Sequence, residues 1–159
     1  MTSRIVVGVD GSAHSNEGLR WALAHAERLG DTEVVAVFAW GLPLIEFPGA
    51  FDKDEIEAGA KRFLQETIQH VAPEPPVPLK LVVAHGDPAT SLIEASQEAS
   101  LLVVGTRGRN PFRGLLLGSV AQGCAADSAC PVVIVKLRQG TERDGAATGA
   151  LEAVLTDDR

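Results

Sequence analysis

The sequence predicts an α/β fold in which helices cover both faces of a parallel, five-stranded sheet. Three observations support this prediction. Short runs of β-branched residues are continuously apolar, helical patterns separate these runs, and 159 residues suit one compact domain. Strands that are apolar at consecutive positions are buried on both faces, which favours a doubly wound sheet.

The first half of the chain is expected to supply strands at 5–9 and 33–39 and helices at 15–29 and 52–71. Both strands are short apolar runs rich in valine. Both helices carry apolar residues at every third or fourth position, which is the period of one buried helix face. Gly30 stands where a glycine commonly ends a helix.

The second half is expected to supply strands at 79–84, 101–104 and 131–137. A helix is expected from Gly118 to about Ser128. A shorter helix precedes the 101–104 strand: Asp87 and Pro88 are typical of an N-cap and a first helical residue. Its apolar side is expected to comprise Leu92, Ile93 and Ala99.

The domain is expected to span 1–138, and the remainder, 139–159, is rich in Gly, Ala, Thr and acidic residues. Such a composition is typical of a flexible C-terminal tail. No apolar run approaches the roughly 18 residues of a membrane span. Cys124 and Cys130 are interpreted as reduced thiols, which favours a cytoplasmic protein. The four histidines are scattered without ligand spacing, so no metal site is expected.

The composition argues against binding to nucleic-acid polymers or to anionic membranes. The formal net charge is −7, and aromatic residues make up 4% with no tyrosine to stack on bases. The charge is uneven, however. Residues 105–118 contain three arginines and no acid, so they carry +3 while the other 145 residues sum to −10. This cationic loop suits a small anion.

Ligands of doubly wound sheets bind at the carboxyl ends of the strands, so the residues after each strand are the candidates for a site. Asp10 follows the first strand. Its carboxylate could accept hydrogen bonds from a ribose hydroxyl or a base amine, or it could be a turn residue that caps the next helix. The pattern favours the two interpretations equally.

The loop after the fourth strand begins with Gly105 and Gly108 and ends at Gly118 and Ser119, where a helix opens. Glycines allow the backbone to approach a ligand, and a helix N-terminus favours an anion. Three arginines add positive charge: Arg107, Arg109 and Arg113. The serine hydroxyl could cap the helix or donate to a phosphate oxygen. The alternative is a solvated loop with ordinary capping residues.

Neither the dinucleotide fingerprint nor the P-loop signature is present in this loop. Its spacing, Gly105-x2-Gly108-x9-Gly118-Ser119, resembles the G-x2-G-x9-G-[S/T] signature of ATP-binding universal stress proteins. The opening segment at 7–12 (VGVDGS) also resembles that family, and the resemblance covers roughly 3–138.

The resemblance implies the adenine-nucleotide α-hydrolase-like sheet, with strand order 3-2-1-4-5. It also implies that ATP is the ligand, with or without Mg²⁺, and that the protein is a homodimer. The dimer would pair the last strands, which here contain Val132, Val133, Ile134 and Val135. The binding residues implied by the resemblance are Asp10, Ala39, Gly105, Arg107, Gly108, Gly118, Ser119 and Val120.

Three functions follow as hypotheses. The first is a nucleotide-dependent regulatory module in the stress response. The second is a slow ATP hydrolase. The two loops offer one acid, Asp10, and no further base or metal ligand, so weak hydrolysis at most is expected and no catalytic residue is assigned. The third is a structural dimer that needs no nucleotide.

Asn110 and Pro111 depart from the glycine-rich loop of the family, and Ala39 is smaller than the branched residue common at its position.

Overall fold

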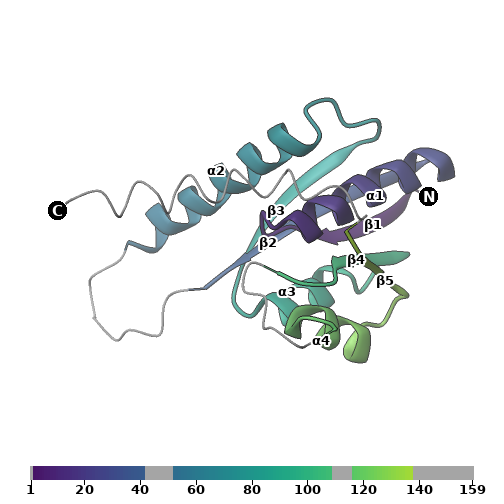
Figure 1. Ribbon diagram of the computed structural model, residues 1–159. Helices are drawn as coiled ribbons and strands as arrows, with labels where there is room; N and C mark the ends of the chain where they lie inside the picture. The colour runs from purple at the N-terminus through teal and green to yellow at the C-terminus, as the bar shows by residue number, and fades with distance from the viewer. Residues whose placement is uncertain (1, 42–51, 109–115, 138–159) are drawn as a thin grey trace.

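The computed structural model describes residues 2–41, 52–108 and 116–137. Five strands and four helices alternate along these residues (Figure 1). The strands are β1 (Ser3–Gly8), β2 (Thr32–Trp40), β3 (Leu79–His85), β4 (Leu101–Gly105) and β5 (Val132–Val135). The helices are α1 (Ala13–Leu29), α2 (Lys53–Val71), α3 (Pro88–Ala95) and α4 (Ser119–Asp127).

The five strands form one parallel sheet in the order β3-β2-β1-β4-β5, as the sequence analysis predicts. The chain moves outward from β1 to β3 on one side and then returns to β4 on the other. The strand order therefore reverses between β1 and β4. In an open α/β sheet this switch point is where a ligand is expected, outside the carboxyl ends of the strands.

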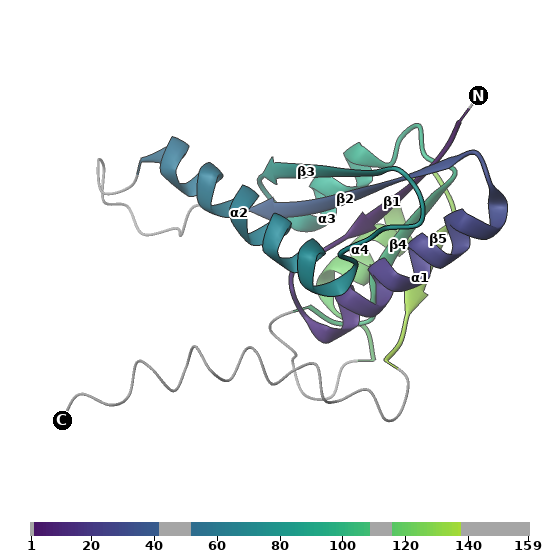
Figure 2. The same cartoon turned by 90° about the horizontal axis from the view of Figure 1, so that it is seen from above.

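The helices cover the sheet in two layers (Figures 1 and 2). Helices α1 and α2 lie on one face, and α3 and α4 lie on the other. The central strand β1 separates the two layers: Ile5, Val6 and Val7 are each 0% exposed. Ile5 and Val7 face the α1 and α2 layer, whereas Val6 faces the α3 and α4 layer. This arrangement explains why the strand is apolar at consecutive positions.

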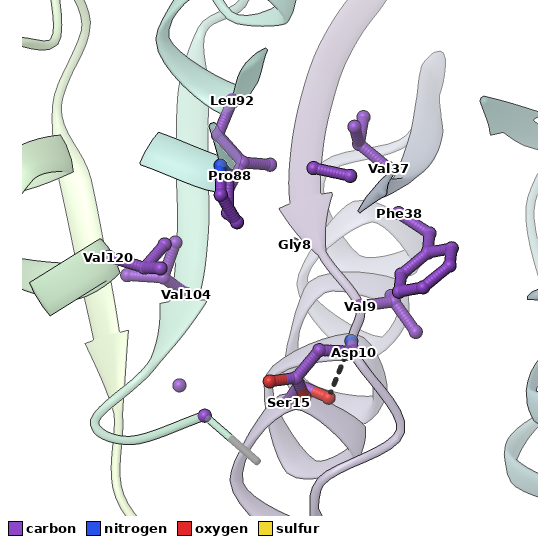
Figure 3. A pocket seen from close by; sticks show the side chains of 13 residues that line it. Gly8, Val9, Asp10, Ser15, Val37, Phe38, Pro88, Leu92, Val104 and Val120 are labelled. Atoms are coloured by element: carbon purple, nitrogen blue, oxygen red, sulfur yellow. Dashed lines mark hydrogen bonds between the residues drawn. The ribbon is translucent and has the colours of Figure 1, made fainter. Parts of the chain in front are cut away.

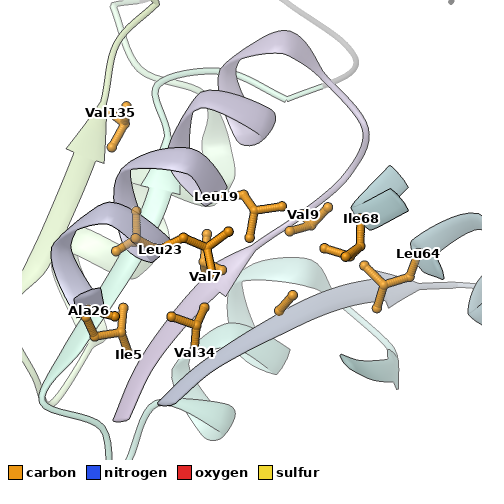
Figure 4. Packing of buried hydrophobic residues seen from close by; sticks show 13 residues of the cluster. Ile5, Val7, Val9, Leu19, Leu23, Ala26, Val34, Leu64, Ile68 and Val135 are labelled. Atoms are coloured by element: carbon orange, nitrogen blue, oxygen red, sulfur yellow. The ribbon is translucent and has the colours of Figure 1, made fainter. Parts of the chain in front are cut away.

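The larger core lies between the sheet and helices α1 and α2, and four buried side chains of α1 pack into it (Figure 4). Leu19 and Leu23 pack over β1, and Leu64 and Ile68 extend the cluster onto α2. Burial of such side chains typically contributes about 1.5–3 kcal/mol each. Gly30 ends α1 with a φ of 67°, as predicted from the sequence.

Each of the five strands differs at one or both ends by one or two residues from the expected bounds, and the differences at the short helix, β4 and β5 concern individual predicted residues. Helix α3 ends at Ala95, so Ala99 lies beyond it rather than on its apolar side, although Ala99 still packs against the second core. The Ser96 hydroxyl donates to the Ile93 carbonyl at 3.0 Å and competes with helix continuation. Gly105 is the last residue of β4 and not a loop residue, and β5 is shorter than 131–137.

Several sequence expectations fall outside the described residues. They concern the tail at 139–159, the arginines at 109 and 113, and the Asn110-Pro111 pair. Among the helices that the structure describes, none has the length and apolarity needed to cross a membrane.

Candidate functional site

The turn between β1 and α1 is built around Asp10. Its Oδ1 accepts a hydrogen bond from the Ser12 amide at 2.9 Å, and its own amide donates to Ser15 Oγ at 3.2 Å. The helix cap is Ser12, whose Oγ accepts from the Ser15 amide. Gly11 adopts a φ of 80°, which a residue with a side chain rarely adopts. Asp10 is therefore a turn residue as one interpretation expected, but it does not cap the helix.

Thr106 is the structural centre of the loop that follows β4. Its amide donates to the Val135 carbonyl at 3.0 Å, and its carbonyl accepts from the Gly118 amide at 2.7 Å. Its hydroxyl lies 2.7 Å from Nδ1 of His14. Thr106 is 5% exposed, so these contacts are largely shielded from solvent. One residue thus joins the end of β5 and the starts of α4 and α1.

Gly105, the last residue of β4, and Gly108, in the loop after it, lack a side chain for different structural reasons. A Cβ at Gly108 would lie 2.7 Å from Asp10 Oδ2, so the absence of a side chain lets the carboxylate reach the loop. A Cβ at Gly105 would lie 2.7 Å from the His14 carbonyl carbon, so this glycine lets β4 pack against the first turn of α1. Gly108 therefore shapes the candidate site, whereas Gly105 primarily allows β4 to pack against α1.

The two ends of the 105–118 segment meet at the start of α4. Gly118 is the N-cap, with no side-chain cap, and a Cβ there would lie 3.4 Å from Arg107 Cα and 3.7 Å from the Gly108 amide nitrogen. Ser119 is the first helical residue, so its hydroxyl is not the cap that one interpretation expected. The first amides of a helix have no intrahelical acceptor and favour an anion.

A recess, partly open to solvent, lies at the switch point between β1 and β4 (Figure 3). In Figure 3, Val104 and Val120 lie on one side of it and Val37 and Phe38 on the other, with Asp10 at one end. The lining is mainly apolar. The complete set is Gly8, Val9, Asp10, Ser15, Val37, Phe38, Ala39, Pro88, Leu92, Val104, Gly105, Gly108 and Val120.

Five of the eight residues predicted from the sequence line this recess: Asp10, Ala39, Gly105, Gly108 and Val120. The other three are Arg107, Gly118 and Ser119, which belong to the adjoining loop and helix start. The structure thus brings together residues from β1, β2, β4 and α4. The described residues contain no group of three or more His, Cys, Asp or Glu that could hold a metal ion.

Sequence reasoning missed several residues of the recess. Pro88 and Leu92 of α3 close it at the end opposite Asp10 (Figure 3), but in the sequence they look like a helix start and a core leucine. A Cβ at Gly8 would lie 2.9 Å from Leu92 Cδ1, so the absence of a side chain at Gly8 leaves room for Leu92. A glycine within the apolar run of β1 was the sequence feature that could have indicated this close packing.

His14 was also missed, because nothing in its spacing relates it to the β4 loop 92 positions away. Partial burial lowers the pKa of His14, and the nearby positive charge of Arg107 lowers it further. The negative charge of Asp10 acts in the opposite direction. An ionisable ring therefore lies beside the loop that carries the candidate anion-binding groups.

A doubly wound sheet with an apolar recess at its switch point, bordered by a carboxylate and a glycine loop, defines a class of α/β ligand-binding proteins. Comparison with known proteins refines this class. The model of the universal stress protein family matches residues 1–136, so the chain belongs to that family.

Known members resemble this chain over most of its length. Universal stress protein Rv2623 of Mycobacterium tuberculosis is 34% identical over 134 residues, which are 83% of this chain and 44% of that relative. The chain thus spans less than half of that relative.

Two solved structures share the fold. One is described as a universal stress protein in complex with cAMP, with a TM-score of 0.64, 26% identity and coverage of 84% of this chain and 96% of that one. The other is a universal stress protein from Archaeoglobus fulgidus in complex with dAMP. Its TM-score is 0.61 and its identity 25%, with 86% and 100% of the two chains covered.

Proposed function

We propose that this protein binds an adenine nucleotide, ATP in particular, in the recess between β1 and β4. The observation that carries the proposal is the close approach of the Asp10 carboxylate to Gly108. A Cβ atom at position 108 would lie only 2.7 Å from Asp10 Oδ2. A carboxylate from the β1 turn and the backbone of the β4 loop thereby border one apolar recess. This combination suits a ligand with an apolar base, hydroxyl groups and an anionic end.

The three parts of a nucleotide match three parts of the recess. The base fits the apolar wall formed by Val37, Phe38 and Ala39. In this proposal the carboxylate of Asp10, which lines the recess, accepts hydrogen bonds from ribose hydroxyls. The phosphates then extend toward the β4 loop and the start of α4, where the proposed ligand groups are Gly105, Arg107, Gly108, Gly118, Ser119 and Val120.

Two kinds of support favour ATP among nucleotides. The titles of two related structures describe complexes with cAMP and with dAMP, which supports an adenine nucleotide as the ligand class. The glycine and serine spacing of the β4 loop and the charge of Arg107 favour a polyphosphate. Mg²⁺ would enter this site together with the phosphates. The cellular role proposed for the bound state is nucleotide-dependent regulation in the stress response.

We further propose that the protein forms a homodimer through β5. This strand is at one edge of the sheet, and its four residues are all apolar. The opposite edge, β3, carries Lys80, and edge lysines discourage pairing between chains. The contrast between the two edges favours β5 as the strand that pairs.

Titration of the protein with ATP, ADP and AMP by calorimetry tests the nucleotide proposal. Saturable binding at one site per chain is expected. Asp10→Ala should weaken it about 10- to 100-fold, because a hydrogen bond to a charged group contributes about 1.5–3 kcal/mol. Asp10→Asn removes the negative charge but keeps an oxygen that can accept from the Ser12 amide. Comparison of the two variants therefore separates the effect of the lost charge from the effect of a disturbed turn. Absence of binding at millimolar nucleotide would overturn the proposal.

Two further measurements distinguish binding from the two other hypotheses. ATP turnover above a purified blank that disappears in Asp10→Ala would indicate a slow hydrolase. A dimer that neither binds added nucleotide nor releases any on acid treatment, as absorbance near 260 nm, would indicate a nucleotide-independent structural protein.

A further inference from the structure

His14 occupies an unusual position beside the candidate phosphate loop. It lies in the first turn of α1, yet its Nδ1 is 2.7 Å from the hydroxyl of Thr106 in the loop after β4. Thr106 is 5% exposed and immediately precedes Arg107. The Thr106 carbonyl also accepts from the Gly118 amide at 2.7 Å. The imidazole is therefore joined, through one buried residue, to both ends of the loop.

This pairing is compatible with either charge of the ring. A neutral imidazole can accept a hydrogen bond from the Thr106 hydroxyl at Nδ1. A protonated imidazole must instead donate a hydrogen bond from Nδ1 to the hydroxyl oxygen. Threonine can take both roles because a hydroxyl both donates and accepts. His14 can thus change its charge without giving up its hydrogen bond to Thr106.

Two charged groups act on the ring in the described part of the chain. Arg107, from the loop after β4, opposes its protonation, and Asp10, from the turn after β1, favours it. Burial opposes protonation more strongly than either charge acts, so the pKa lies below its usual value. An anion placed beside Arg107 would counter the repulsion between the two cations.

We propose that His14 is a positioning residue of the nucleotide site, and that its ring takes up a proton when the phosphates bind. The inference rests on the proposed function. The hydrogen bond to Thr106 holds the segment that carries Arg107, and the protonated ring supplies a second cation next to that arginine.

Proton uptake fixes the sign of the pH dependence. Phosphate charge raises the pKa of His14 in the complex above its value in the free protein. The affinity therefore increases as the pH falls through the bound-state pKa, and it levels off below the free-state pKa. Each unit of difference between these two pKa values corresponds to a tenfold change in affinity. We expect an effect of about 3- to 10-fold.

The test compares ATP binding by wild type and His14→Asn, across the pH range in which histidine titrates. Asparagine retains a group able to pair with Thr106 but does not titrate there. ATP itself titrates in this range, so the difference between the two proteins is the relevant quantity. His70→Asn is the matched control, because His70 is exposed near the end of α2. Calorimetry in buffers of different ionisation enthalpy measures the protons taken up.

The expected result is proton uptake by wild type and by His70→Asn in excess of that by His14→Asn, with a steeper pH profile. Identical uptake and profiles in all three proteins would overturn the inference and leave the proposed function standing. If wild type binds no nucleotide at any pH, the proposed function fails and this inference fails with it.

Substitution of Thr106 tests the positioning role separately. Thr106→Val removes the hydroxyl and should weaken ATP binding about 3- to 10-fold at every pH, the typical effect of one neutral hydrogen bond. Thr106→Ser should restore the affinity and the proton uptake. Full affinity and unchanged proton uptake in Thr106→Val would contradict the role of this hydrogen bond.

Discussion

Asp10 and Gly108 approach each other across the point at which the strand order reverses. A carboxylate next to a side-chain-free backbone leaves room for a ligand to contact both. The sequence indicated both residues, because an acid after a first strand and a spaced glycine pair are local patterns. It could not indicate that the glycine makes room for that acid, since the two are 98 positions apart.

Gly108→Val is predicted to abolish most nucleotide binding with little effect on folding. Its Cβ would be 2.7 Å from Asp10 Oδ2, so the carboxylate must move away from the recess. We expect at least a tenfold loss of ATP affinity by calorimetry, equivalent to about 1.4 kcal/mol. Gly59→Ala in α2 is the control, because no atom lies within 4 Å of its new Cβ. Equal affinities in the two variants would contradict the assignment of Gly108.

His14 and Thr106 could not be predicted as partners from the sequence. A histidine in a helical first turn and a threonine after a strand are each ordinary in isolation. Their contact depends on how closely β4 packs against α1, which in turn depends on Gly105. Contacts of this kind are set by tertiary packing and leave no local pattern.

At the scale of elements, Gly105 determines how closely α1 can lie on β4. A methyl group at this position would be 2.7 Å from the His14 backbone, which cannot move as a flexible side chain can. Gly105→Ala is predicted to destabilise the protein by about 1–3 kcal/mol, the usual effect of overpacking.

Thermal unfolding of Gly105→Ala measures this effect. A chain of this size loses about 2–4 °C of Tm per kcal/mol. Gly59→Ala should instead gain up to about 1 kcal/mol from helix propensity. An unchanged Tm in Gly105→Ala would show that α1 can shift without penalty, contrary to the packing argument.

Glu33 links three adjacent strands through ion pairs. It accepts from Arg4 Nε on β1 at 2.8 Å and lies 2.9 Å from Lys80 Nζ on β3. Its pKa is lowered first by the hydrogen bond from Lys80 and then by that from Arg4. Since the folded-state pKa is below the unfolded value, the stabilisation is present above the unfolded pKa. It is lost as the pH falls through the folded-state pKa.

Glu33→Gln is therefore predicted to lower the free energy of unfolding at neutral pH by about 0.2–1 kcal/mol per pair lost. Urea denaturation of both proteins at neutral and at acidic pH measures the difference. The gap should close in acid, where the wild-type carboxyl is itself protonated. A gap that persists unchanged at acidic pH would contradict the electrostatic origin of the effect.

The order and type of the nine described elements could be predicted because their periodicities are strong and glycine, proline and cap residues mark several ends. The end of α3 could not, since its C-cap residue is Ser96 and no glycine or proline marks the position. The placement of Gly105 in β4 likewise depends on pairing with β5, which a local pattern does not show.

At the scale of the whole molecule, the strand order was implied by resemblance to a family and is confirmed by the sheet. Alternation of strands and helices alone predicts a parallel sheet with covered faces, but several strand orders satisfy it. The order matters for function because it decides where the switch point lies. Here it brings the β1 turn and the β4 loop to one recess.

The proposed dimer is tested by a charge on the edge strand. Val133→Lys should convert a dimer into a monomer in sedimentation analysis, because an edge lysine discourages strand pairing. Leu81→Lys on β3, where the side chain is 40% exposed, is the matched change on the opposite edge and should leave the dimer intact. A monomeric wild type, or a dimer lost only in Leu81→Lys, would contradict pairing through β5.

A methyl NMR spectrum recorded during titration with ATP tests most directly whether an adenine nucleotide occupies the recess between β1 and β4. We expect saturable shifts of the methyl signals of four residues that line the recess: Val37, Leu92, Val104 and Val120. Little change is expected at Leu64 and Ile68, which lie on the buried face of α2 and do not line the recess. Spectra that do not change at millimolar ATP, or shifts confined to methyl groups outside the recess, would contradict nucleotide binding in the recess.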